Sequence, residues 1–223
     1  TVSDKFYVSN IVYVSIGQGG GTKTEGIGEK NGQQNLQETY NSNVGAGPFG
    51  PIIDTEFSDT EYKAGSYLKS SVNNHYWYGG LSTLNYQATD KLSLAGGIDM
   101  RYYKGEHYSE IYDLLGGDYA VSTDNINQLS AVKRVGDKIG YHNDGIVKWS
   151  GVFSQAEYSN GILSAFFNIS GSNSAYKRID YFKEKVIKVG DDEGKHASTD
   201  WKWIRGYTVK TGANVNLDEY NNV

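Results

Sequence analysis

Six segments of this chain alternate apolar and polar residues with a period of two, which is the pattern of a β-strand with one apolar face. The clearest is 92–102, where Leu94, Ile98 and Met100 alternate with small or polar residues. The other segments are 6–16, 76–88, 147–154, 163–170 and 207–217. The 28 glycines and 19 tyrosines favour turns and half-buried pleated surfaces. The sequence therefore predicts an all-β fold.

The apolar face of one segment is less regular than the others. In 147–154 the pattern puts Val147, Trp149 and Phe153 on the apolar face and leaves Val152 out of place. The same choice puts Tyr158 on the opposite face from its strand's apolar residues, so either a bulge or a wrong face assignment is expected here.

Short and long connections alternate along the chain. The short ones are 88–91 and 159–161, and the second contains Asn-Gly, a strong hairpin signal. The long ones are 17–72, 104–144 and 179–200. Antiparallel strands then place all short turns at one end and all long loops at the other. This arrangement is typical of outer-membrane barrels and unusual in compact soluble domains.

The segments suit a membrane barrel in other ways. No window approaches 18 consecutive apolar residues, which excludes a membrane helix, but strands of about 9–11 residues can cross. Aromatic residues are expected in two girdles: Tyr76, Tyr78, Tyr102, Trp203 and Tyr207 near the long loops, and Tyr86 and Tyr158 near the short turns. Six strands are too few to close a barrel, which needs about eight. Residues 1–223 are therefore expected to be one partial barrel within a larger protein.

Composition and motifs exclude several other functions. A net charge of −5 argues against nucleic acid as a partner, and the absence of cysteine excludes disulfides and thiolate chemistry. The glycine-rich residues 17–23 lack the spacing of a phosphate-binding loop and are expected to form an external loop. Glu106 and Glu110 are a possible glycosidase pair in a predicted loop. Residues 191–194 could hold calcium, although a solvated turn is favoured. The sequence does not predict an enzyme or a bound cofactor.

Several stretches carry a family likeness: 76–80 with Tyr86, 92–103 with 105–108, 166–172, 176–182, 200–203 and 214–222. Together they resemble the middle of the barrel of a TonB-dependent outer-membrane receptor of the Bacteroides type. The resemblance implies a 22-stranded barrel plugged by an N-terminal domain. It also implies energised import of a scarce nutrient, such as an iron chelate, a cobalamin or a glycan, across the bacterial outer membrane.

The resemblance also implies partners. These are outer-membrane lipid, the TonB protein through an N-terminal region outside this chain, the nutrient ligand, and in some cases a surface lipoprotein. The plug and the last barrel strands are likewise expected to lie outside these residues.

Candidate ligand-binding residues should face inward near the long loops. By parity these are Trp77, Asp99, Arg101, Tyr103, His142, Tyr176 and Arg178. For Asp99 and Arg101 a hydrogen-bonded inner wall that contacts the plug is favoured over ligand contact. A metal site is not expected at the four histidines, which are His75, His107, His142 and His196. No two of them have the spacing of metal ligands, and each falls in a different predicted loop or rim.

One alternative remains, a secreted or surface β-sandwich that binds carbohydrate on exposed aromatic rings. A sandwich buries its apolar faces against each other, whereas a membrane barrel points them outward. The two are therefore distinguished by five residues, which a sandwich would pack into one internal core: Leu94, Ile98, Phe167, Val209 and Val215.

Overall fold

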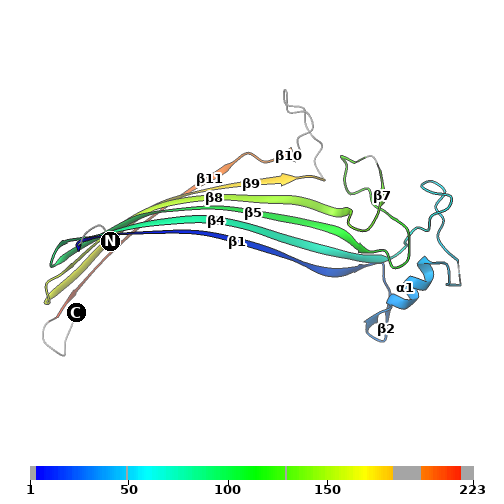
Figure 1. Ribbon diagram of the computed structural model, residues 1–223, viewed down its shortest axis with the longest axis horizontal. Helices are drawn as coiled ribbons and strands as arrows, with labels where there is room; N and C mark the ends of the chain where they lie inside the picture. Colours follow the sequence, from blue (N-terminus) through cyan, green and yellow to red (C-terminus); the bar gives the residue numbers. More distant parts are fainter. Residues whose placement is uncertain (1–3, 49, 129, 183–196, 217–223) are drawn as a thin grey trace, which may run out of the picture.

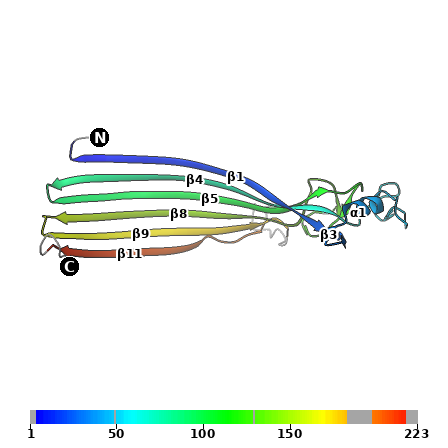
Figure 2. The same cartoon turned by 90° about the horizontal axis from the view of Figure 1, so that it is seen from below.

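Six long strands form one antiparallel sheet in the computed structural model, which describes residues 4–48, 50–128, 130–182 and 197–216. In spatial order they are β1 (Phe6–Glu25), β4 (Tyr67–Thr89), β5 (Leu92–Asp113), β8 (Lys138–Ser159), β9 (Leu163–Asp180) and β11 (Lys202–Val215), with the short β10 (Ala197–Ser198) also paired to β9. Figures 1 and 2 show the strands side by side in a single layer that bends along its length. The all-β prediction is confirmed.

The two ends of the sheet differ, as the sequence predicted. Two-residue and three-residue connections join β4 to β5 and β8 to β9 at one end, where Gly161 has φ 92°. The opposite end carries the connections 26–66 and 114–137 (Figure 1). These connections contain β2 (Glu29–Lys30), β3 (Gln33–Gln34), α1 (Leu36–Asn43), β6 (Ala120–Val121) and β7 (Val132–Lys133).

The long connections are shorter and more ordered than expected. The glycine-rich residues 17–23 belong to β1 and pair with 69–75 of β4, so the prediction of an external loop there is wrong. Glu106 and Glu110 likewise lie within β5. The connections pack on the sheet around a small core formed by Ala64, Ile111, Leu114, Ala120 and Ile139. Buried Asn43 links them, since its Nδ2 donates to the carbonyls of Ser66 and Leu114, each at 2.9 Å.

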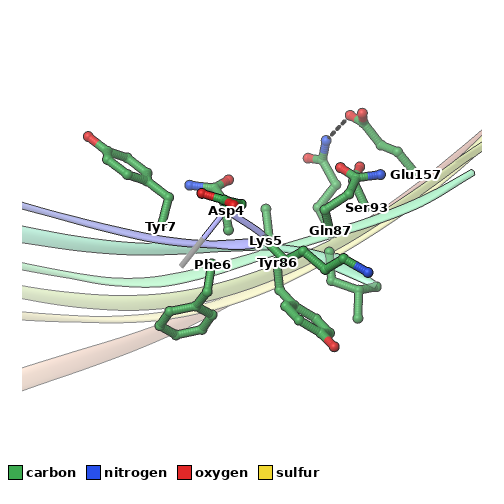
Figure 3. A pocket seen from close by; sticks show the side chains of 12 residues that line it. Asp4, Lys5, Phe6, Tyr7, Tyr86, Gln87, Ser93 and Glu157 are labelled. Carbon is green, nitrogen blue, oxygen red and sulfur yellow. Dashed lines mark hydrogen bonds between the residues drawn. The ribbon is translucent and has the colours of Figure 1, made fainter. Parts of the chain in front are cut away.

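Register assigns each strand residue to a face, because directly paired residues point to the same side of an antiparallel sheet. We call "apolar face" the one that carries the row Phe6, Tyr86, Leu94, Ala156, Phe167 and Thr211. The "polar face" carries the row Tyr13, Gly79, Arg101, Trp149, Ser174 and Ile204. At the short-turn end, Figure 3 shows Tyr7, Gln87 and Glu157 on one side of the sheet and Phe6 and Tyr86 on the other.

The predicted apolar face of 147–154 is wrong. Val152 pairs with Ile98 and Gly171 on the apolar face, and this places Trp149 and Phe153 on the polar face. Tyr158 pairs with Leu92 and with Ala165 and therefore joins the apolar face, with no register shift in the pairing of β8 near it. The wrong face assignment, and not a bulge, explains its parity.

The apolar face is open over most of its area. The exposed fractions are 37% for Leu94, 47% for Ile98, 47% for Phe167, 55% for Val209 and 36% for Val215. The described residues thus contain neither the internal core that the sandwich alternative requires nor a second sheet that packs on this face.

Candidate functional site

A hollow of about 650 Å³ lies on the polar face, across β1, β4, β5 and β8. Its lining residues are Ser15, Gly17, His75, Trp77, Arg101, Tyr103, Val147 and Trp149. Half of these residues carry aromatic rings, and the single formal charge is that of Arg101. The hollow therefore suits a ligand with flat apolar surfaces.

Strand register explains why the hollow forms here. Trp77, Tyr103 and Val147 stand in one row across β4, β5 and β8. The next row toward the long loops consists of Gly17, His75, Gly105, Gly145 and Arg178. Three of these five positions are glycines, so few side chains fill the space above the sheet there.

Aromatic contacts fix the shape of the hollow. The rings of Trp77 and Tyr103 meet edge to face with centroids 5.6 Å apart. His75 stacks on Tyr103 with centroids 5.7 Å apart, and its Nδ1 lies 2.5 Å from the tyrosine hydroxyl. The three side chains hold one another, so the wall is formed before any ligand arrives.

Arg101 forms the opposite wall together with Trp149. Its guanidinium lies 4.7 Å from the Trp149 ring centroid, a cation–π geometry. Its Nε donates to Asp99 Oδ1 at 3.1 Å, and a second bond joins Nη2 to Oδ2. The charge of Arg101 is thus balanced by Asp99.

Glycines on the polar face let large rings lie flat against the sheet. Phe153 covers Gly97, where an added Cβ would come within 2.7 Å of the ring. Tyr13 covers Gly79, and Trp149 covers Gly151, in the same way. This pairing of aromatic residues with strand glycines explains how the rings of Trp149 and Phe153 fit on the polar face.

The predicted site residues fall into three groups. Trp77, Arg101 and Tyr103 line the hollow. Three others share the polar face outside it: Asp99 beside Arg101, Tyr176 in the row of Trp77, and Arg178, whose Nη2 lies 3.2 Å from Asp180 Oδ2. His142 is on the apolar face, in register with Tyr108, so its predicted inward direction is wrong. It stacks on Tyr181 with centroids 4.1 Å apart.

Sequence reasoning missed His75, Val147 and Trp149. His75 shares the parity of Trp77 and could have been found by extending that segment by one residue. Val147 and Trp149 were assigned to the wrong face. Only the β5–β8 register, which pairs Trp149 with Arg101, places them here.

The histidines are closer together than expected. His75 and His107 lie side by side on the polar face with ring centroids 5.9 Å apart, although their sequence positions suggested separate loops. Within the described ranges no group of three His, Cys, Asp or Glu residues could hold a metal ion. His196 and the acidic residues 191–194, for which a solvated turn is expected, lie outside the described residues.

The apolar face bears a different cluster close to the long loops. Lys104 Nζ lies 2.8 Å from Glu106 Oε1 and 3.1 Å from Asp144 Oδ2. Buried Asp144 also accepts from the Tyr181 hydroxyl at 2.8 Å. Burial raises the pKa of Tyr181 to about 12, and the hydrogen bond to Asp144 acts in the same direction. Because Glu106 is bound to Lys104, it is not a free carboxylate for glycosidase chemistry.

A hollow of about 350 Å³ at the short-turn end is a weaker candidate. Residues from both faces line it at the edge of the sheet, among them Phe6, Tyr7 and Tyr86 (Figure 3). It is remote from the long loops, where a ligand is expected to enter.

Comparisons with known proteins identify no family for this chain. In the ranges that the structure describes, no helix combines the length and apolar character needed to cross a membrane. A scan against protein-family models, a search of curated proteins and a search of solved structures each find no match.

Proposed function

We propose that this chain is part of the wall of an energised, TonB-dependent transporter in the bacterial outer membrane, which captures and imports a scarce nutrient. The observation that most supports this proposal is the exposed apolar surface on one face of the sheet. This surface is confined to the half of the sheet near the short turns. Soluble proteins rarely leave a continuous apolar surface of this extent uncovered.

The height of this apolar band supports the proposal. Along β1 it runs from Phe6 to Ile16, and the residues that follow on the same face are Gln18, Asn74 and Glu106. About ten residue steps of ~3.3 Å, tilted by ~40°, give a band ~25 Å tall. The lipid-facing band of outer-membrane barrels is also ~25 Å tall.

Aromatic residues border this band. At the short-turn edge are Phe6, Tyr86 and Tyr158, and at the long-loop edge are Tyr76, Tyr78, Tyr102 and Trp203, all on the apolar face. Such girdles mark both membrane interfaces in barrels. Tyr207, expected in the second girdle, is instead in the row of Ile98 and Val152, midway along the band.

The sheet has open edges that a larger barrel would close. Within the described residues β1 pairs only with β4, and β11 only with β9. Long unpaired strand edges promote aggregation, and closure of a barrel removes them. We therefore infer further strands on both sides, as in the roughly 22-stranded barrels of plugged outer-membrane transporters.

In this proposal the polar face lines the interior, and its aromatic hollow contacts the cargo. Asp99 and Arg101 form the adjacent wall toward the plug. The nutrient classes remain those of the family resemblance: an iron chelate, a cobalamin or a glycan.

The membrane position is tested by site-directed spin labelling, which is convenient because the natural sequence has no cysteine. Single cysteines at Leu94, Ile98 and Met100 should carry labels that contact lipid and collide with oxygen. Labels at Ala95 and Asp99 should collide instead with a water-soluble nickel chelate, or be shielded from both reagents. The protein is measured in phospholipid vesicles. If oxygen accessibility does not alternate along β5, the membrane proposal fails and the sandwich alternative gains.

A second experiment tests the cargo contact. The double variant Trp77→Ala/Tyr103→Ala should lower nutrient uptake roughly tenfold or more, since each aromatic contact contributes ~0.5–1.5 kcal/mol beyond area burial. Growth of cells limited in turn for an iron chelate, cobalamin or a glycan provides the measurement. Tyr7→Ala, on the same face at the short-turn end, is the control. Unchanged uptake by the double variant, at equal surface abundance, would assign the hollow to plug contact.

A further inference from the structure

A second hollow, of about 450 Å³, lies at the long-loop edge of the apolar band. Its lining residues on the apolar face are Tyr78, Met100, Tyr102, Lys148, Ser150, Asn173 and Trp203. Tyr78 and Tyr102 form one wall with centroids 6.2 Å apart. Trp203, whose side chain is largely exposed, forms the other. Small residues of β8 and β9 between the walls keep the hollow open.

The ammonium group of Lys148 places a positive charge at this hollow. It lies in the row of Tyr102 and Ala175, and its ammonium is 4.6 Å from the ring centroid of Trp201. Within the described residues it has no carboxylate at ion-pair distance. Its charge is therefore oriented by an aromatic ring and is not balanced by any carboxylate of the described residues.

Two more cations lie near Lys148 on the same face. Lys177 is two residues beyond Ala175 along β9, diagonal to Lys148 and therefore ~7–8 Å from it. Arg205 is in register with Asn173 on the other side of the hollow. The described residues offer neither of them an ion-pair partner. Lys104 is different, because Glu106 and Asp144 already balance its charge.

We propose that this hollow binds the phosphate-bearing headgroup of an anionic membrane lipid. The inference rests on the proposed membrane position, in which the hollow lies at the aromatic girdle. Lipid phosphates occupy that level, and lysine side chains reach them by extending along the apolar surface. The charges are complementary, since cations that have no ion-pair partner among the described residues meet an anion at the height of the lipid phosphates.

A lipid fits the hollow better than free phosphate does. The exposed apolar surface continues from the hollow toward the short turns through Met100, Val152 and Tyr207. An acyl chain attached to the phosphate would cover this surface, whereas inorganic phosphate would leave it uncovered. The structure thus provides for both the charged and the apolar part of one molecule.

The experiment compares two brominated lipids as quenchers of tryptophan fluorescence. The protein is reconstituted in phosphatidylcholine vesicles that contain either brominated phosphatidylglycerol or brominated phosphatidylcholine. Trp203, on the apolar face at the hollow, is the reporter, and Trp203→Phe shows which part of the signal comes from it. We expect the anionic lipid to quench at lower mole fraction.

Variants then locate the preference. Lys148→Gln/Lys177→Gln should reduce the preference for phosphatidylglycerol by roughly fivefold for each lysine removed. The matched control is Lys202→Gln, which removes a cation at the same height but on the polar face, in the row of Tyr103 and Tyr176. It should retain the wild-type preference.

The outcomes separate this inference from the proposed function. Equal quenching by both lipids overturns the headgroup site and leaves the membrane position intact, whereas no quenching by either lipid contradicts the membrane position itself. An equal loss of preference in Lys202→Gln would show a diffuse charge effect and overturn the site. Excess inorganic phosphate should not reduce the preference for phosphatidylglycerol. A reduction would show that the hollow binds free phosphate and would overturn the assignment of a lipid.

Discussion

In the proposed membrane position, replacing Val152 with arginine should destabilise the protein by about 2–4 kcal/mol, the cost of a cation on a lipid-facing strand near the bilayer midplane. Val152 lies on the apolar face in the row of Ile98 and Tyr207, midway between the two aromatic girdles. Neither girdle is close, so the new guanidinium must bring water into the hydrocarbon or pull the strand out of place. The free energy of unfolding is measured by urea titration in phospholipid vesicles.

The control for this variant is Ser172→Arg. Ser172 follows the register partner of Val152 and points to the polar face, beside Gly151 and Gly206. There the cation would meet a polar surface, and the free energy of unfolding should change by less than about 1 kcal/mol. A larger loss of unfolding free energy for Ser172→Arg than for Val152→Arg would show that the lipid-facing and interior faces had been assigned the wrong way round.

These two variants also examine the strand on which sequence reasoning failed. Val147, Trp149 and Phe153 alternate as an apolar face should, yet they lie on the polar face. The cause is in neighbouring positions, where glycines leave room for Trp149 and Phe153 to lie flat. Gly97, which Phe153 covers, lies on the neighbouring strand β5, and a periodicity within β8 contains no information about it, so the β5–β8 register was needed.

Sequence patterns located the strands but not their full lengths. Beyond the band both faces are polar, for example at Asn73, Asn74, Glu106 and His107, so the alternation that reveals a strand ends there. Backbone pairing continues nevertheless to Glu25 of β1. The sequence therefore predicted the part of each strand that has a contrast between its faces and assigned the rest to loops.

The candidate site was predicted best where register was simplest. A two-residue turn joins β4 to β5, and clear alternation in β5 placed Arg101 and Tyr103 on the polar face with Trp77. His142 was misplaced because its position was derived from the misassigned face of β8. The β5–β8 register also shifts next to His142, between Tyr108 and Ser109 of β5, which local sequence patterns do not reveal.

The relation between glycines and rings leads to the second large effect. Gly97→Val should destabilise the protein by about 1–3 kcal/mol, as overpacking of a filled site does. An added Cβ would lie 2.5 Å from the carbonyl oxygen of Ser82 and 2.7 Å from the ring of Phe153. The ring can turn away, but the Ser82 oxygen is backbone of the neighbouring strand and cannot move without disturbing the sheet.

Gly145→Val is the matched control, on the same face and without any atom within 4 Å of the added Cβ. It should leave the free energy of unfolding nearly unchanged. Combining Gly97→Val with Phe153→Ala separates the two contacts, because removal of the ring should recover only the part of the loss that the ring causes. Equal stability of Gly97→Val and Gly145→Val would contradict the close approach of Phe153 to Gly97. The explanation for how the ring of Phe153 fits on the polar face would then be lost, whereas the position of Trp149, which rests on the β5–β8 register, would be unaffected.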